Sequence, residues 1–176
     1  MARRLSGKHR VFIDANILIR GLTLPRFPYE ILRAGTLGQV QLLTSMSVLA
    51  KARHYIETKF SAHVERLERF LGMGVLIVVD DPLEEVVHRH ENLVRDADDV
   101  PVALAAIQAR ATYLVSTDAD LTTIDASTER LRQRITPMRP GDFLKDVLGW
   151  TSAELSRIER RTWQGLEAEN GEEARS

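Results

Sequence analysis

The segment Val11-Phe12-Ile13-Asp14-Ala15-Asn16 decides the fold, because a short run of large apolar residues ends on a carboxylate and then an amide. A run of this length and composition predicts a buried strand. The pattern returns at Tyr113-Leu114-Val115-Ser116-Thr117-Asp118-Ala119-Asp120, where a second apolar run also ends on acids. In an open parallel sheet, ligands bind at the carboxyl ends of the strands. We therefore expect acids from distant parts of the chain to meet in one cleft.

Short apolar runs alternate with segments of helical periodicity along the chain. The expected strands lie near residues 11–13, 40–43, 75–79, 112–115 and 134–136. Helical spacing is found near residues 28–36, 46–59, 62–73, 83–94 and 100–109. This alternation predicts the α/β class, with a three-layer α/β/α arrangement around a central parallel sheet of about five strands.

The composition is typical of one globular domain. The chain has 176 residues, 44% of them hydrophobic and 28% charged, with a net charge of -1. We expect a basic N-terminal arm over residues 1–9, the domain over residues 10–149, and a C-terminal helix with a polar tail over residues 150–176. The absence of Cys excludes disulfides and a cysteine nucleophile. No apolar run is long enough for a signal peptide or a membrane span, so a cytoplasmic location is expected.

The acids of the two opening segments, together with Asp99, admit two interpretations. Asp14, Asp99 and Asp118 each precede a helical segment, where Asp is a favoured N-cap. Capping does not require Asp120 next to Asp118, or Asn16 beside Asp14. Converging carboxylates bind hard divalent cations, and such cations serve phosphodiester hydrolysis. The second interpretation is therefore a metal-dependent nuclease site.

Several blocks of the sequence, in this order, resemble the PIN-domain nucleases, and in particular the toxin components of toxin-antitoxin pairs. The resemblance covers roughly residues 10–146 and rests on residues 11–18, 95–105, 113–121, 135–137 and 141–144. It implies a central parallel sheet with helices on both sides. It also implies cleavage of RNA with Mg²⁺ or Mn²⁺, a homodimer, and inhibition by a small antitoxin protein.

The resemblance also assigns site residues. It matches Asp14, Asp99 and Asp118 to the family's metal-binding acids, Asp120 to an additional acid, and Asn16 and Ser116 to positions that order the carboxylates or the attacking water. The expected activity is that of a metal-dependent endoribonuclease.

One position departs from the family pattern. Lys51 stands in the helical segment 46–59, where the family usually has an acid. An ammonium group in place of a carboxylate removes an oxygen ligand and adds a repulsive charge, so cation affinity should fall. Lys51 contacts the scissile phosphate, or Asp96 or Asp98 supplies the missing ligand through water, or the chain is a weakened PIN module that binds RNA or a protein partner.

A third class, the phosphotransfer domains of receiver or dehalogenase type, also places acids at strand ends. The sequence counts against it. A dehalogenase-type motif needs a second Asp where Asn16 stands, and a receiver needs a late strand ending in Lys, whereas Lys145 lies in a helical pattern.

The C-terminal segment predicts a surface helix that docks on the domain or on a partner. Thr151 and Glu154 have the spacing of a capping box, and Asn170-Gly171 is expected to end the helix. The pair Arg160-Arg161 is interpreted either as a phosphate-contacting patch or as part of a solvated helix face.

Overall fold

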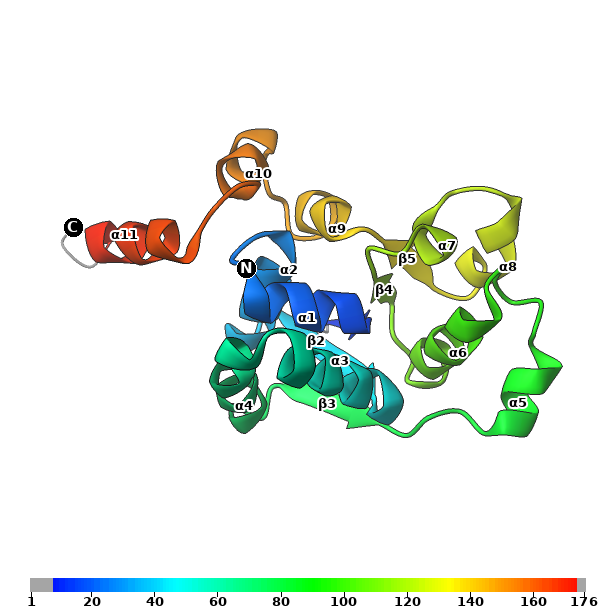
Figure 1. Cartoon of the computed structure of the whole chain (residues 1–176). Helices are drawn as coiled ribbons and strands as arrows, with labels where there is room; N and C mark the ends of the chain where they lie inside the picture. The colour runs from blue at the N-terminus through cyan, green and yellow to red at the C-terminus, as the bar shows by residue number, and fades with distance from the viewer. Residues whose placement is uncertain (1–7, 174–176) are drawn as a thin grey trace, which may run out of the picture.

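A five-stranded parallel sheet with the order β3-β2-β1-β4-β5 forms the centre of the computed structural model, which describes residues 8–173 (Figure 1). The strands are β1 (His9–Ile13), β2 (Val40–Ser45), β3 (Leu76–Val79), β4 (Tyr113–Val115) and β5 (Thr136–Met138). The predicted α/β class and five-stranded parallel sheet are confirmed. The central strand β1 carries the deciding apolar run, and Val11, Phe12 and Ile13 are completely buried.

Helices connect all consecutive strands. The first two crossovers contain α1 (Ala15–Thr23), α2 (Phe27–Thr36), α3 (Met46–Lys59), the short 3₁₀ helix Ser61–His63 and α4 (Val64–Gly72). The next two contain α5 (Glu84–Arg89), the 3₁₀ turn Ala97–Asp99, α6 (Val100–Gln108), α7 (Ala119–Thr122), the 3₁₀ turn Ala126–Thr128 and α8 (Glu129–Arg132). Three more helices follow β5: α9 (Pro140–Asp146), α10 (Ser152–Ile158) and α11 (Trp163–Glu173).

The strand order places a topological switch between β1 and β4. The chain leaves β1 towards β2 and leaves β4 in the opposite direction towards β5. Right-handed crossovers therefore place α1 to α4 on one face of the sheet and α6 on the other. Phe12 pairs with Leu43 of β2 and with Leu114 of β4, so the two acid-bearing strands are direct neighbours. A crevice at such a switch, beyond the carboxyl ends of the strands, is where open α/β sheets bind ligands.

Two predicted elements differ from the structure. The helix expected over residues 83–94 stops at Arg89, because the chain turns to bury Leu93 and Val94, which are 6% and 4% exposed. The last strand lies at Thr136–Met138 rather than 134–136, and it includes Pro137. Proline lacks a backbone N–H, but β5 is an edge strand and tolerates it.

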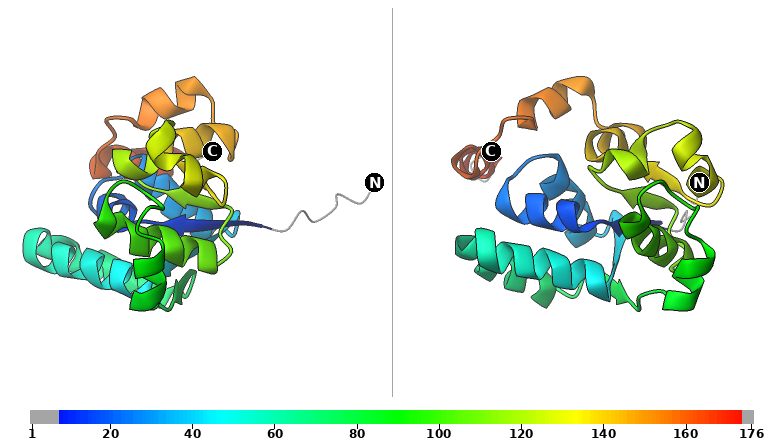
Figure 2. Two further views of the ribbon diagram at one scale, coloured as in Figure 1. Left: turned by 90° about the vertical axis from the view of Figure 1, so that its right-hand side faces the viewer. Right: turned by 45° about the vertical axis from the view of Figure 1, so that its right-hand side comes forward.

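The C-terminal segment forms two helices where one was predicted. Thr151 and Glu154 make the capping box that starts α10. The chain breaks after Ile158, and α11 then continues through Asn170 and Gly171 to Glu173, so the predicted helix end is wrong. Both helices lie on the α1–α2 side of the molecule, away from α5 and α8 (Figures 1 and 2).

The ends of the chain are described only in part. Most of the expected basic arm, residues 1–7, and the last residues of the polar tail, 174–176, lie outside the described residues. His9 already belongs to β1. Among the described residues no helix combines the length and the apolar character needed to cross a bilayer.

Candidate active site

Asp14 stands at the carboxyl end of β1 and begins α1. Its Oδ1 accepts a hydrogen bond from the backbone N–H of Ala15 at 2.7 Å. Its Oδ2 accepts from the Ser116 hydroxyl at 2.7 Å and from the Asn16 amide at 3.1 Å. Asp14 is therefore an N-cap, as the simple interpretation predicted. It is also fixed by two side chains from the predicted site, Asn16 on α1 and Ser116 at the end of the neighbouring strand β4, in a position that is only 8% exposed.

Ser116 joins the ends of β1 and β4. Its Oγ accepts a hydrogen bond from the Asn16 amide at 3.2 Å and from the backbone N–H of Asp118 at 3.0 Å. Asn16 in turn accepts a hydrogen bond from the backbone N–H of Thr117 at 3.1 Å. The amide and the hydroxyl predicted as supporting groups thus hold the two acid-bearing loops in one fixed arrangement.

Asp118 begins α7 and accepts a hydrogen bond from the backbone N–H of Asp120 through Oδ1 at 2.8 Å. This is again a cap. No described residue donates a hydrogen bond to its other carboxylate oxygen, which leaves a lone-pair-bearing atom available for a ligand.

Asp99 does not act as a cap, which separates it from the other two acids. It precedes α6, but its side chain accepts no hydrogen bond from the helix. Its Oδ2 is buried and has no hydrogen-bond partner among the described residues. Burial, followed by the negative charges of Asp118 and then Asp14, with Asp96 and Asp120 adding to them, raises the pKa of Asp99 to about 7. A buried carboxylate oxygen without a donor, facing several other acids, is chemically suited to a cation.

Asp96, Asp99 and Asp120 offer carboxylate oxygens that all lie within 4.8 Å of one another. Asp96 is exposed and also caps the turn before α6, accepting from the backbone N–H of Asp98 at 3.0 Å. Sequence reasoning had placed Asp96 only as a possible ligand through water. The Arg95 side chain, which is 70% exposed, forms an ion pair with Asp120. The sequence did not reveal this pair, because the partners come from different loops.

Lys51 is not connected to these acids by any contact. It lies exposed on α3, and its ammonium group forms no hydrogen bond or ion pair with the part of the chain that the structure describes. The charges that shift the pKa of Asp99 come from acids alone. The structure therefore brings together Asp14, Asn16, Ser116, Asp118, Asp120, Asp99 and Asp96, and leaves Lys51 outside this network.

Replacement of Asp99 by Asn is expected to stabilise the metal-free protein at high pH. Because the pKa of Asp99 is about 7 in the folded protein and 3.8 in the reference state, the folded state holds an extra proton between these values. Ionised Asp99 thus lowers stability increasingly as the pH rises through this window. We expect Asp99→Asn to raise the free energy of unfolding by about 1–2 kcal/mol at pH values above the folded pKa, after allowance for solvent screening.

The measurement is urea denaturation in EDTA at pH values below and above the window. Well below the lower value Asp99 is protonated in both states, so there the variant and the wild type should have similar unfolding free energies. Asp80→Asn is a suitable control, because Asp80 is exposed and makes no side-chain hydrogen bond or ion pair with other described residues. If the gain in unfolding free energy were independent of pH, or equally large in Asp80→Asn, the raised pKa of Asp99 would be contradicted.

Comparison with known proteins identifies the family. The sequence pattern of the PIN domain matches residues 10–120, and the chain belongs to the PIN domain family. This confirms the family predicted from the sequence. No curated protein sequence matches the chain.

Three solved structures share the fold, each with a TM-score of 0.52. VapBC2 from Rickettsia felis, bound to a DNA fragment from their promoter, is 16% identical over 74% of this chain and 98% of that one. PAE2754 from Pyrobaculum aerophilum is 14% identical over 81% of this chain and 97% of that one. FitAcB from Neisseria gonorrhoeae is 18% identical over 74% and 97%. At these identities the similarity concerns the fold.

Proposed function

We propose that this protein is a metal-dependent endoribonuclease of the PIN-domain type. The observation that carries the proposal is the buried Oδ2 of Asp99, which has no hydrogen-bond donor among the described residues and faces several other carboxylates. A carboxylate in such a place costs folding free energy unless a cation or a proton compensates it. Function, rather than stability, is the reason to keep it.

The donor set fits Mg²⁺ or Mn²⁺, because these hard cations prefer oxygen ligands. In our proposal the cation is held by Asp14, Asp99, Asp118 and Asp120, with Asp14, Asp99 and Asp118 as the catalytic acids. Asp96 shares the cluster with Asp99 and Asp120. The chemistry that the cation supplies is neutralisation of phosphate charge and a lower pKa for water.

The remaining steps belong to the chain itself. Ser116 and Asn16 donate to Oδ2 of Asp14 and so fix the orientation of its carboxylate. Because the pKa of Asp99 is raised to about 7, the metal-free protein holds a proton there below neutral pH, and this proton must leave before the carboxylate binds a cation. Metal affinity should therefore rise with pH through the same window.

The test is cleavage of a labelled single-stranded RNA by purified protein with Mn²⁺, with Mg²⁺ and with EDTA. We expect cleavage with either cation, none in EDTA, and a large loss in Asp118→Asn. The mechanism would be contradicted if the wild type cleaved RNA equally well with and without EDTA, or if Asp118→Asn cleaved it as fast as the wild type.

A toxin role is part of the proposal and has its own test. It rests on the resemblance to PIN-domain toxins, which also suggests a homodimer, a small antitoxin and a cytoplasmic location. Expression of the chain should arrest growth, and co-expression of a short neighbouring reading frame should relieve the arrest. Growth arrest that persists in Asp14→Asn would separate toxicity from hydrolysis.

A second candidate function is a catalytically weakened PIN module that binds RNA or a protein partner. Lys51 favours it, because an acid usually occupies this place in the family. On this second candidate function position 51 reaches the cation, although Lys51 contacts none of the acids. Lys51→Glu should then tighten Mn²⁺ binding by about tenfold, because it adds an oxygen ligand and removes a repulsive charge. Calorimetric titration checks this.

Lys59→Glu provides the matched control, since Lys59 is exposed at the end of the same helix α3. Equal Mn²⁺ affinity in both variants and the wild type would show that position 51 is remote from the cation, and that Lys51 does not impair it.

A further inference from the structure

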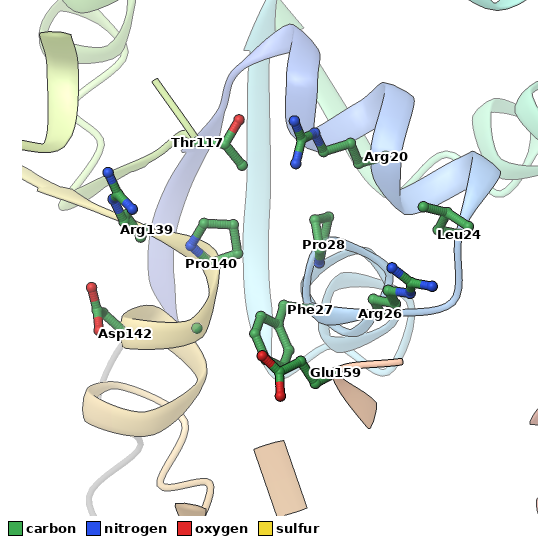
Figure 3. Close-up of a pocket in the computed structure, with 11 residues that line it drawn as sticks. Arg20, Leu24, Arg26, Phe27, Pro28, Thr117, Arg139, Pro140, Asp142 and Glu159 are labelled. Atoms are coloured by element: carbon green, nitrogen blue, oxygen red, sulfur yellow. The ribbon is translucent and has the colours of Figure 1, made fainter. Parts of the chain in front are cut away.

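A cavity of about 480 Å³ lies next to the acidic cluster (Figure 3). Thr117 forms one end of the cavity, and in the sequence it lies between Ser116 and the acid Asp118. Because the backbone N–H of Thr117 is bound to Asn16, this end of the cavity is fixed to the network that holds Asp14. The cavity therefore adjoins the candidate active site at Thr117, although none of the site's acids lines it. Its volume is in the range of small-molecule sites.

Three arginines line this cavity, and two of them have no partner among residues 8–173. Figure 3 shows Thr117 between Arg20 and Arg139. The side chains of Arg20 and Arg139 are exposed and form no hydrogen bond or ion pair with any described residue. Arg26 is half-buried and donates to the backbone oxygen of Arg161 at 3.4 Å. Two free guanidinium groups on either side of one cavity are suited to a phosphate group, which they bind through paired hydrogen bonds.

The positions of the two free arginines follow from the fold. Arg20 comes four residues after Asn16 on α1, so both side chains lie on one face of this helix. Arg139 directly follows β5, whose Met138 accepts a hydrogen bond from the backbone N–H of Ser116 at 3.1 Å. Both arginines therefore extend from the carboxyl edge of the sheet that carries the acids.

The rest of the cavity lining consists of apolar residues and two acids. Phe27, Pro28 and Pro140 form an apolar wall, and Gly141 leaves room beside the ring of Phe27, since a Cβ there would lie 3.5 Å from it. Two carboxylates, Asp142 and Glu159, also line the cavity, and Glu159 lies by Phe27 at the end away from Thr117 (Figure 3). Arg20 and Arg139 thus flank Thr117, while Asp142 lies on the side of Arg139 and Arg26 lies on the side of Glu159 (Figure 3).

We propose that this cavity is a subsite for the nucleotide of single-stranded RNA that adjoins the scissile phosphate, with Arg20 and Arg139 binding its phosphate and the Phe27 wall contacting its base. An RNA strand whose phosphodiester lies at Asp14 and Asp118 can continue into this cavity, because Thr117 directly precedes Asp118 and lines the cavity. The inference rests on the proposed nuclease function. An apolar wall beside two guanidinium groups suits a nucleotide, which has both a flat base and a phosphate, better than an acidic peptide.

The test is equilibrium binding of a fluorescent single-stranded RNA in EDTA, where hydrolysis does not occur. We expect Arg20→Gln and Arg139→Gln each to weaken binding at least about fivefold. Each should also lower the slope of log affinity against log salt by about 0.7, the value for one lost phosphate contact on a single strand. Phe27→Leu should weaken binding without changing the salt slope.

Arg110→Gln is the matched control. Arg110 is exposed in the turn before β4, at the opposite edge of the sheet. Its substitution removes the same charge without altering the cavity. It should change the affinity by less than about twofold. Equal losses in Arg110→Gln and Arg20→Gln would show a general charge effect and overturn the subsite.

Hydrolysis with Mn²⁺ separates this inference from the function on which it rests. Arg20→Gln and Arg139→Gln should raise KM with little change in kcat, as expected for lost substrate binding. RNA hydrolysis with unchanged binding and KM in both variants would overturn the subsite and leave the nuclease intact. If the wild type binds RNA but does not hydrolyse it, and the two variants lose this binding, the result would support the subsite and contradict the nuclease.

A peptide competitor tests the remaining occupant. An oligoglutamate peptide that binds the wild type but not Arg20→Gln, while both bind RNA equally, would show a protein-docking site and overturn the proposal. Absence of RNA binding by the wild type would overturn both proposals.

Discussion

Asp14→Asn is expected to lower the rate of RNA hydrolysis by about 10³-fold while leaving the protein folded. Asn has nearly the same shape as Asp, and its carbonyl oxygen can still accept the hydrogen bond from the Ala15 backbone. The variant loses one negative charge at the junction of β1 and β4, where a cation is proposed to bind. It also loses the acceptor Oδ2 for the Ser116 hydroxyl and the Asn16 amide, because an amide NH₂ group cannot accept these hydrogen bonds. The measurement is the single-turnover rate of RNA cleavage with saturating Mn²⁺.

Ser116→Ala is the control for this variant, because it removes a donor to Asp14 but keeps every carboxylate. We expect a smaller loss, about tenfold to a hundredfold, since the Asn16 amide still holds Oδ2 of Asp14. Urea denaturation should show both variants folded. If Asp14→Asn retained a tenth of the wild-type rate, the carboxylate would not be essential and the site assignment would be wrong.

Arg161→Met is expected to lower the free energy of unfolding by about 3–5 kcal/mol, the largest stability effect predicted for the chain. The Arg161 side chain is 5% exposed and is paired with Glu30, which is 3% exposed. Its Nε also donates to the backbone oxygen of Pro25 at 2.7 Å. The variant leaves Glu30 buried with only Arg33, at 3.4 Å, as a positive partner. Urea denaturation with a fitted m value measures the loss.

The double variant Glu30→Leu with Arg161→Met distinguishes the buried charge from lost packing. Two apolar side chains of similar volume leave no unpaired charge, so we expect more than half of the lost stability to return. A double variant as unstable as the single one would show that packing, rather than the ion pair, accounts for the effect.

The same contact connects the C-terminal helices to the proposed RNA subsite. Arg161 holds the chain after α10 against Pro25 and Glu30, directly beside Arg26 and Phe27. Trp163 reinforces this docking, because its indole N–H donates to the backbone oxygen of Thr23 at 3.1 Å. Arg161→Met should therefore also weaken RNA binding, through displacement of the cavity wall.

The central part of the fold was predictable because each signal was local. The apolar runs that became β1 and β4 end on acids within the same segment, so the strand and its functional residue could be found together. The strand order β3-β2-β1-β4-β5 was not predicted, because the rules of parallel sheets reduce the possible orders without choosing one. Once the order is known, the switch point between β1 and β4 follows. The capping interpretation of Asp14 and Asp118 was also correct. It is compatible with the proposed site, since the charge of each also raises the pKa of Asp99.

Other parts of the site depend on tertiary contacts that no segment reveals. Arg161 was interpreted as a phosphate-contacting or solvated residue, yet it is buried and paired with Glu30. The sequence did not reveal this pair, because the two residues lie 131 positions apart. The ion pair of Arg95 with Asp120 joins two loops in the same way. Arg20 shows the signal that was available and not used: it stands one helical turn after Asn16 and therefore on the same face.

Direct binding of Mn²⁺ tests most sharply whether the acidic cluster is a cation site. Calorimetric titration of the wild type at a pH above the pKa of Asp99 should show saturable binding, weakened at least about tenfold in Asp14→Asn and Asp99→Asn and unchanged in Asp80→Asn. Binding should also weaken as the pH falls below about 7 and Asp99 takes up its proton. Equal affinity in the wild type and in both cluster variants, or no binding at all, would contradict the assignment of this site.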